Sequence, residues 1–467
     1  MKRQEWDVLV IGGGPGGTPT AMALAAAGRQ VLLVESGAGL GGTCLFEGCI
    51  PSKILRESAR RKRELEQADA FGLCLAGGRL HLDWSAIMQR KRALLERRSQ
   101  AALMRLQRLP GLELVFGSAR LIGGGRALIE QAGEQSEIRF RQAVIATGSL
   151  PHPPPIPGLD HPRVMDSAAL LDTDRIPERL VVIGGGPIGV ELGQIFHTFG
   201  SAVTILESAE GILGAVDQEL AGMLQQSMTE QGIEVITGCR VGDIANTGGG
   251  GIYVEFQQDD GAPGRRFADT VLVVTGRRPN VDGLGLEATA IEHDRHGIQV
   301  DADLQTAETG VYAVGDVIGQ PMFAHWATAQ GLALAQRLLG QPVPLPDPDH
   351  NSAVIFSDPE IGVAGLTEQQ ARERGIDVGV ARYDFSQDAR AQIRERDQGL
   401  LKIVYQRKTR RVLGVHALVD GAGDLMGEAA LAIGNGITLE ALAVAIHPHP
   451  TLSESFAGAA RGALAGR

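Results

Sequence analysis

The stretch that determines the fold is DVLVIGGGPGG, residues 7–17, in which a short apolar run leads directly into a glycine-rich turn. The residues that follow predict an Ala-rich helix at Thr20–Ala27, which Gly28 ends, and a second strand at Val31–Val34 that closes with Glu35. This order of elements is typical of a dinucleotide-binding fold, because glycines permit a tight turn and bring the backbone close to a pyrophosphate. The stretch therefore predicts a nucleotide site near the start of the chain.

Four residues of this unit are predicted to contact the nucleotide. The pyrophosphate would rest on the N-terminus of the helix, and the acid that closes the second strand would accept hydrogen bonds from ribose hydroxyls. A plain turn between a strand and a helix is the alternative, but the strand, the helix and the acid are all in register here. The predicted contacts are Gly12, Gly14, Gly17 and Glu35.

The same unit recurs later in the chain. A strand at Leu180–Ile183 leads into GGGPIG, residues 184–189, a helix that reaches Phe199, and a strand at Val203–Leu206 that closes with Glu207. The first glycine and the closing acid are 23 positions apart in both units. An acid at this place repels a 2′-phosphate, so the second nucleotide is predicted to be NAD rather than NADP. The predicted contacts are Gly184, Gly186, Gly189 and Glu207.

Length and charge narrow the class of protein. A chain of 467 residues is expected to form about three domains. The net charge of -11 argues against nucleic acid or an anionic membrane as a partner. The basic runs Arg56–Lys62 and Arg90–Arg98 have helical spacing and are interpreted as solvated helix faces. The first apolar run, Val8–Ile11, ends directly in glycines, which indicates no signal peptide or membrane helix, and the cytoplasm is the expected location.

Two proline-rich stretches mark the expected domain boundaries. They are PHPPPIPG, residues 151–158, and the stretch Gln341–Asp349. Beyond the second stretch, apolar strands at Leu400–Tyr405 and Val412–Leu418 and an Ala/Leu-rich helix predict an α+β domain. We therefore expect an α/β protein with two Rossmann-like nucleotide-binding domains, at 1–150 and 151–275, the first completed by about 276–346, and a C-terminal α+β dimerisation domain at 347–467.

Two of the four cysteines are candidates for redox chemistry. Cys44 and Cys49 lie in GGTCLFEGCIPSK, residues 41–53. In a regular helix, five residues rise about 7.5 Å, which exceeds the limit of about 7 Å between the Cα atoms of a disulfide. Gly48 and the preceding glycines are expected to distort the helix start, and Lys53 and the helix dipole to favour a thiolate. A pair of buried structural thiols is the alternative, and Cys74 and Cys239 are expected to be inert.

A second candidate group lies near the C-terminus, in HPHPTLSE, residues 447–454. His449 and Glu454 stand five positions apart on a turn stiffened by proline. Imidazole titrates in the range needed to deprotonate a dithiol, and a carboxylate on the other ring nitrogen fixes its tautomer. The alternatives are a surface turn or a metal-binding histidine pair. No further ligand lies nearby in sequence, so no metal is expected.

Taken together, these residues resemble the pyridine nucleotide–disulfide oxidoreductase family, and within it most the dihydrolipoamide dehydrogenases. The resemblance runs over essentially the whole chain. Besides the motifs above, it is carried by ATGS (residues 146–149), TGRRPN (275–280), GVYAVGD (310–316), FSDPE (356–360) and the stretch from Gly427 to Glu454.

The resemblance implies FAD and NAD as cofactors and a homodimer as the active enzyme. Cys44 would be the interchange thiol, Cys49 the thiol stacked on the flavin, and Lys53 would pair with Glu191. His449 and Glu454 would be the base and its orienting acid, contributed by the partner subunit. Asp316 would bind the ribitol of FAD, and further cofactor contacts would come from Gly42, Thr43, Thr147, Gly148 and Gly276.

The implied reaction is oxidation of dihydrolipoamide, carried on a lipoylated protein, with NAD as acceptor. An NADH-dependent reductase of another small disulfide or of a quinone is the closest alternative, and a non-catalytic flavoprotein is a more distant one. Three places depart from the family pattern: Phe46-Glu47 between the cysteines, Pro187 in the second glycine motif, and Trp326 after His325. Glu47 adds negative charge beside the cysteine pair.

Overall fold

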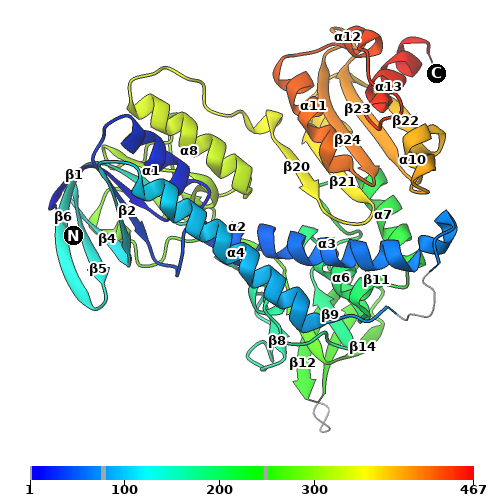
Figure 1. Ribbon diagram of the computed structural model, residues 1–467, viewed down its shortest axis with the longest axis horizontal. Helices are drawn as coiled ribbons and strands as arrows, with labels where there is room; N and C mark the ends of the chain where they lie inside the picture. The colour runs from blue at the N-terminus through cyan, green and yellow to red at the C-terminus, as the bar shows by residue number, and fades with distance from the viewer. Residues whose placement is uncertain (1–2, 75–79, 247–250, 467) are drawn as a thin grey trace.

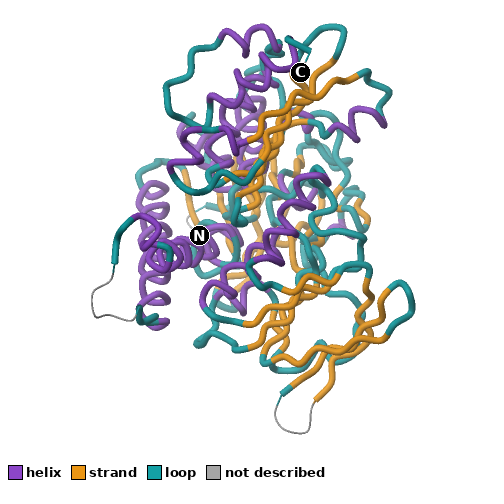
Figure 2. Tube along the Cα trace, turned by 90° about the vertical axis from the view of Figure 1, so that its right-hand side faces the viewer, coloured by secondary structure: helices purple, strands orange, loops and turns teal. Residues whose placement is uncertain are grey.

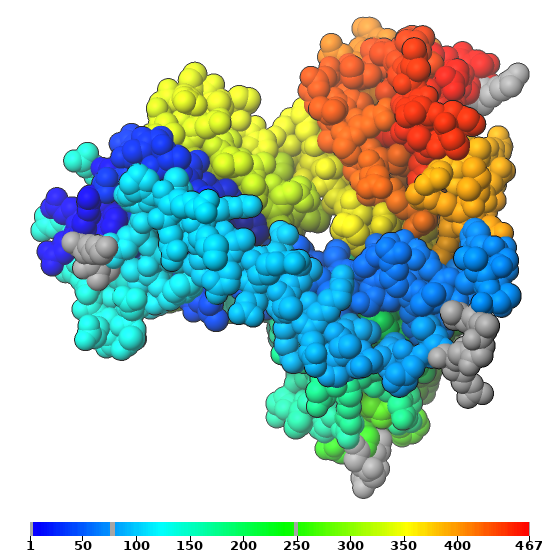
Figure 3. Space-filling model, in the orientation of Figure 1, coloured from blue at the N-terminus to red at the C-terminus, as the bar shows by residue number. Residues whose placement is uncertain are grey.

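A computed structural model describes residues 3–74, 80–246 and 251–466 of the chain. The described residues form three lobes, one built mainly from each third of the chain (Figures 1 and 3). Two long helices, α3 (Cys49–Glu66) and α4 (Trp84–Gln107), run from the first lobe along the other two (Figure 1). We call the lobes the first, second and C-terminal units. Among the described residues, no helix is both long and apolar enough to cross a lipid bilayer.

The first unit is built on a seven-stranded sheet with the order β3-β2-β1-β6-β5-β4, in which β19 also pairs with β6. Strands β1 (Glu5–Ile11), β2 (Val31–Glu35) and β3 (Leu112–Phe116) are parallel, as is β6 (Glu134–Ile145) beside β1. β4 (Ser118–Gly123) and β5 (Arg126–Gln131) form an antiparallel extension. β19 (Val311–Ala313) returns from far along the chain. Helix α1 (Gly17–Ala26) packs on this sheet and against α8 (Ala324–Leu338).

The second unit repeats the strand–helix–strand arrangement. Its parallel sheet has the order β11-β10-β9-β15-β8, with α6 (Pro187–Phe199) between β9 (Arg179–Ile183) and β10 (Ala202–Leu206). Helix α5 (Ser167–Leu171) and helix α7 (Gln218–Glu230) accompany it. The remaining strands of the sheet are β8 (Val164–Met165), β11 (Glu234–Ile236) and β15 (Thr270–Val273), beside an antiparallel sheet of β12 (Cys239–Asn246), β13 (Ile252–Gln258) and β14 (Pro263–Ala268).

The chain leaves the first unit and returns to it through one short ribbon. β7 (Ser149–Pro151) pairs antiparallel with β16 (Arg277–Pro279), so that Ser149 lies opposite Pro279. The whole second unit is thus inserted between two segments that hydrogen bond to each other.

The C-terminal unit has an antiparallel sheet with the order β20-β21-β24-β23-β22. Figure 2 shows these strands near the top, with helices packed beside them. The strands are β20 (Ser352–Ile355), β21 (Glu360–Gly365), β22 (Val378–Asp384), β23 (Leu400–Gln406) and β24 (Val412–Val419). The helices are α9 (Glu368–Glu373), α10 (Ala389–Ile393), α11 (Ala422–Gly434), α12 (Leu439–Val444) and α13 (Glu454–Leu464). The predicted fold class, two Rossmann-like units and a C-terminal α+β unit, is confirmed.

Close backbone contacts explain a glycine that is required in each nucleotide unit. A Cβ atom on Gly17 would lie 1.9 Å from the carbonyl oxygen of Gly12, and one on Gly189 would lie 2.0 Å from that of Gly184. These oxygens belong to the backbone of the preceding turn and cannot swing away. Each glycine therefore lets the helix begin directly against the end of its strand.

We predict that Gly189→Ala destabilises the protein, because α6 must move off its turn to make room for the methyl group. Overpacking of this kind costs about 1–3 kcal/mol, which should lower the midpoint of thermal unfolding followed by circular dichroism. Gly222→Ala is the matched control, since Gly222 is exposed on α7 and an added Cβ meets no atom within 4 Å. That change should raise stability by up to about 1 kcal/mol. Equal midpoints for Gly189→Ala and the parent protein would contradict the prediction.

Candidate active site

The two closing acids bind the glycine turns in the same way. In the first unit, the Glu35 carboxylate accepts hydrogen bonds from the backbone N–H of Gly13 and Gly37, both at 2.6 Å. In the second unit, the Glu207 carboxylate accepts from the N–H of Gly185 at 2.6 Å and of Ala209 at 2.8 Å. The repeat recognised in the sequence is therefore also a repeat of contacts, in which each acid fixes its glycine turn against the end of the second strand.

The helix starts beyond these turns are open to an anionic ligand. Among the described residues, no side chain caps α1 or α6, and neither helix has an acid in its first turn. An added Cβ on Gly186 meets no atom within 4 Å, and one on Gly14 meets only the Cα of Gly42, at 4.0 Å. Gly42 and Thr43 begin α2 (Gly42–Phe46) beside the first turn. Free backbone N–H groups with space above them fit the pyrophosphates of two dinucleotides.

Asp316, the residue that the family resemblance assigns to the ribitol of FAD, lies where the connecting ribbon meets the first unit. Ser149 donates a hydrogen bond to the Asp316 carboxylate at 2.6 Å, and Arg277 donates to the Ser149 hydroxyl at 2.7 Å. Asn280 is bound on both sides of its backbone: its carbonyl oxygen accepts from the Thr147 hydroxyl at 2.7 Å, and its N–H donates to the carbonyl oxygen of Gly148 at 2.9 Å. Gly276, with φ of +148°, stands at the start of the returning strand. The acid and hydroxyl groups present fit a polyol chain.

The two candidate cysteines lie at a break between two helices. Cys44 belongs to α2, which ends at Phe46, and Cys49 is the first residue of α3. Gly48 breaks the helix between them with φ of −143° and ψ of −100°. Both are free thiols in the structure, and their side chains hydrogen bond to each other. The regular-helix separation that would forbid this contact does not apply, because the chain is not helical at Glu47 and Gly48.

The contact between the two thiols shifts their pKa values in opposite directions. The pKa of Cys49 is lowered to about 7, chiefly by the hydrogen bond from Cys44 and also by Lys53, while burial and Glu191 oppose the shift. The same hydrogen bond, together with burial, raises the pKa of Cys44 well above its usual range. Near neutral pH the reduced pair therefore keeps a proton on Cys44, and about half of the molecules carry a thiolate at Cys49.

An ion pair stands beside this thiolate. The ammonium group of Lys53 lies 2.7 Å from Oε2 of Glu191, on α6 of the second unit. It also lies 4.4 Å from the ring centroid of Phe356, a cation–π contact that no local sequence pattern indicates. The pairing implied by the family resemblance is thus present, and it joins two units of the protein.

The histidine and acid near the C-terminus are in contact with each other but not with the cysteines of the same chain. Nδ1 of His449 lies 3.1 Å from Glu454, which is the first residue of α13 and also accepts from the N–H of Thr451 at 2.9 Å. That hydrogen bond and His449 lower the pKa of Glu454. The His449 side chain is 71% exposed, and Figure 1 places α13 at the top of the C-terminal unit and α2 in the middle of the molecule.

Sequence reasoning missed one charged residue near the cysteines. Arg98 lies close enough to Cys44 to favour its thiolate form. It lies one turn beyond Leu95, which packs in a small apolar cluster with Leu45, the neighbour of Cys44. Arg98 is exposed, as the interpretation of its basic run as a solvated face predicts, and it lies at the edge of the site.

Comparison with known families gives two matches that together span most of the chain. Residues 6–331 match the pyridine nucleotide-disulphide oxidoreductase model. Residues 351–460 match the model of the pyridine nucleotide-disulphide oxidoreductase dimerisation domain.

Individual proteins are similar over the full length. The dihydrolipoyl dehydrogenase of Thermus scotoductus is 39% identical over 465 residues, covering 97% of this chain and 96% of that protein. That of Bacillus subtilis is 35% identical over 449 residues and 96% of each chain. Among solved structures, the Cu(II) complex of the HOCl-induced flavoprotein disulfide reductase RclA from Escherichia coli superposes with a TM-score of 0.88 at 28% identity, covering 98% of this chain and 99% of that one.

We predict that Cys44→Ala raises the pKa of Cys49. The alanine removes the hydrogen bond that contributes most to the lowered pKa, while Lys53 remains in place. The rate of alkylation of the reduced protein by iodoacetamide, measured against pH, should therefore rise at higher pH in the variant than in the parent. Cys74→Ala is the control, because Cys74 is exposed and outside the pair. An unshifted profile for Cys44→Ala would contradict the assigned hydrogen bond.

Proposed function

This chain belongs to the pyridine nucleotide-disulphide oxidoreductase family, and on that premise we propose that it oxidises protein-bound dihydrolipoyl groups with NAD as the acceptor. The relatives named dihydrolipoyl dehydrogenase are NAD-linked flavoproteins, and this chain uses FAD and NAD(H). The observation that carries the proposal is the contact of Cys44 with a Cys49 of lowered pKa beside the Lys53–Glu191 pair. The full-length relatives named dihydrolipoyl dehydrogenase support the choice of substrate.

The residues of the first unit would hold FAD, and those of the second unit would hold NAD. The Gly12–Gly17 turn, Glu35 and Asp316 would face the first nucleotide, and the Gly184–Gly189 turn and Glu207 would face the second. When bound, FAD supplies an acceptor for the electron pair of the reduced cysteines and a hydride donor to NAD.

The thiol chemistry follows from the geometry of the side chains. His449 takes a proton from one substrate thiol on Nε2, because Glu454 occupies the Nδ1 side. The resulting thiolate attacks Sγ of Cys44 in the oxidised Cys44–Cys49 pair, which forms a mixed disulfide and releases Cys49 as a thiolate. The second substrate thiol then attacks the substrate sulfur of the mixed disulfide, which closes the lipoyl ring and releases Cys44, and Cys44 takes up the proton of that thiol. The substrate loses two electrons and two protons, and the cysteine pair gains the electrons.

The match to a dimerisation domain supports a homodimer. We propose that His449 of one subunit serves Cys44 of the other, because His449 is exposed and lies away from Cys44 in its own chain. The cytoplasm is the location that we propose for this enzyme, since four cysteines are too few for a disulfide-stapled secreted protein of this length.

Subunit mixing tests the proposed sharing of the site. Homodimers of Cys44→Ser and of His449→Gln should each have no activity with dihydrolipoamide and NAD, or an activity lower by about 10²–10⁴-fold. Heterodimers that carry one variant of each kind retain one intact site of two and should regain about half of the parent activity per dimer, by the additivity of independent sites. Absence of recovery in isolated heterodimers would show that the base acts within its own chain.

The nucleotide preference follows from Glu207. Its carboxylate stands at the end of β10, where a 2′-phosphate of NADP would meet like charge, an arrangement that costs several kcal/mol. We expect kcat/KM for NAD to exceed that for NADP by at least about 100-fold, which corresponds to about 2.8 kcal/mol. Initial rates with the two nucleotides at fixed dihydrolipoamide measure this. Equal values would contradict the role given to Glu207.

NADH-driven reduction of another disulfide, or of a quinone, is the second candidate. The similarity to the disulfide reductase RclA, at a TM-score of 0.88, favours it. A panel of disulfides and quinones assayed with NADH separates the two candidates: the proposed function expects lipoamide to have the highest kcat/KM. The second candidate replaces the first if another acceptor has a higher kcat/KM than lipoamide and if the oxidation of dihydrolipoamide does not depend on Cys44.

A further inference from the structure

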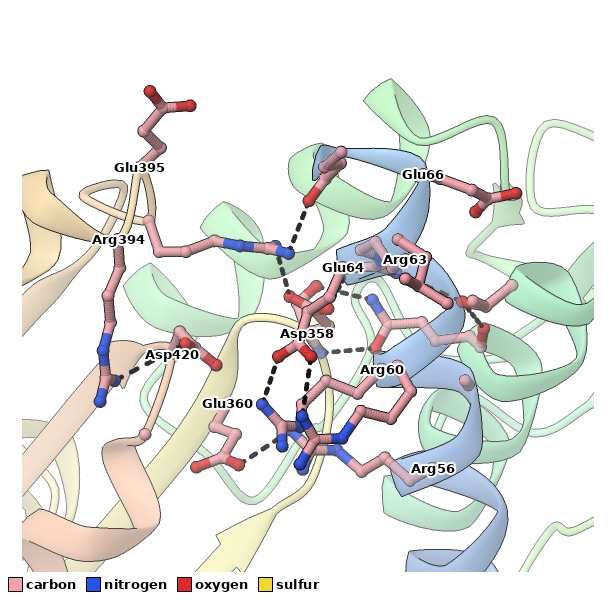
Figure 4. Close-up of a pocket in the computed structure, with 18 of the residues that line it drawn as sticks. Arg56, Arg60, Arg63, Glu64, Glu66, Asp358, Glu360, Arg394, Glu395 and Asp420 are labelled. Carbon is pink, nitrogen blue, oxygen red and sulfur yellow. Dashed lines mark hydrogen bonds and ion pairs between the residues drawn. The ribbon is translucent and has the colours of Figure 1, made fainter. Parts of the chain in front are cut away.

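A five-residue segment of the C-terminal unit reaches the place where helices α3 and α6 meet. The segment is Phe356–Glu360, between β20 and β21. It forms part of the wall of a cavity of about 1140 Å³ that residues of all three units line. Figure 4 shows Asp358 in the middle of this cavity wall, with Arg63 on one side and the side chain of Glu360 below. The thiol chemistry described above does not use this segment directly.

Helix α6 holds the segment through two residues one turn apart. Oε1 of Glu191 accepts a hydrogen bond from the N–H of Phe356 at 2.9 Å. The Gln194 amide accepts from the N–H of Asp358 at 2.9 Å and donates to its carbonyl oxygen at 2.8 Å. Gln194 is only 4% exposed, so water does not compete for these bonds. The two side chains bind the backbone as a neighbouring strand would, and they fix its register along α6.

Helix α3 holds the same segment from the other side. Lys53 covers the Phe356 ring, Arg56 donates to the carbonyl oxygen of Ser357 at 3.1 Å, and Arg63 pairs with the Asp358 carboxylate. Positions 53, 56 and 63 share one face of a helix with 3.6 residues per turn. The Asp358 carboxylate also lies 3.4 Å from Arg396 of its own unit. Contacts from all three units therefore converge on three consecutive residues, Phe356, Ser357 and Asp358.

Glu191 connects this junction to the thiols. One of its oxygens binds the N–H of Phe356, and the other binds Lys53. If the segment slides or tilts, Glu191 loses one partner and its carboxylate is free to turn, and Lys53 loses both the ion pair and the Phe356 ring. We infer that Gln194 and Asp358 are positioning residues that hold the Lys53–Glu191 pair in place beside Cys49. The inference rests on the proposed function only in that Cys49 is a reactive thiolate.

The direction of the effect follows from the groups that face Cys49. They are Cys44 from α2, Lys53 from its own helix, and Glu191 from α6. Lys53 lowers the pKa of Cys49 by more than Glu191 raises it. Loosening the pair is therefore expected to raise the pKa of Cys49, whereas the hydrogen bond from Cys44 is unaffected.

The test is the pH dependence of Cys49 alkylation by iodoacetamide in the reduced, full-length holoenzyme, with tandem mass spectrometry to locate the alkyl group. Gln194→Met removes both bonds to Asp358 at similar volume and should raise the apparent pKa of Cys49 by at least about 0.5 unit, a roughly threefold smaller ratio of thiolate to thiol at a given pH. Asp358→Asn keeps the backbone bonds to Gln194 and weakens the pairs with Arg63 and Arg396, so a smaller shift in the same direction is expected. The double variant should shift no further than Gln194→Met, because both residues act through one contact.

Asp217→Asn is the matched control. Asp217 caps α7 and pairs with Lys402 of β23 at 2.6 Å, so it also joins the second and C-terminal units. Asparagine keeps the cap, and the profile of Cys49 should not change. A parent-like profile in folded Gln194→Met, or an equal shift in Asp217→Asn, would overturn the inference. If Gln194→Met does not fold, a parent-like profile in Asp358→Asn overturns it. No lipoyl substrate enters this measurement, so its failure is distinct from failure of the proposed function.

Discussion

A single carboxylate, that of Glu191, is bound from two sides by groups that belong to different parts of the chain. Lys53 reaches it from α3 at 2.7 Å, and the backbone of Phe356 reaches it from the C-terminal unit at 2.9 Å. Its own helix, α6, begins at the second glycine turn. A charge only 8% exposed is costly unless it is paired and hydrogen bonded. This requirement keeps three units in register around the thiol that begins α3.

The repeated nucleotide unit was predictable because its determinants are local. Each unit places a strand, a turn that only glycine can make and a helix one after another within about 25 residues. Glu35 and Glu207 mark the end of the second strand in the sequence. The helix ends were less accurate: α1 begins at Gly17, inside the glycine turn, rather than at Thr20. Glycine is a poor helix former, so its place in the first turn is set by contact with Gly12 and not by propensity.

The contacts that complete the site were not predictable from local patterns. Gln194 and Asp358 are 164 positions apart, and nothing in the residues around either one indicates the other. The two cysteines were recognised from their glycine-rich surroundings, but the division of one proton between them depends on where α2 ends and α3 begins. The proximity of Arg98 to Cys44 could not be predicted from the basic run, because the position of Arg98 relative to α2 depends on how the apolar face of α4 packs.

The ribbon of β7 and β16 has a consequence for how such a protein diversifies. Because Ser149 lies opposite Pro279, the two ends of the intervening 129 residues, from Leu150 to Arg278, are already in contact. An entire nucleotide module can therefore be lost, gained or exchanged at one place, while every strand of the first sheet keeps its neighbours. Such an exchange also replaces Glu191 and Gln194, so the thiol site is kept only where the incoming module brings equivalent partners for Lys53 and Asp358.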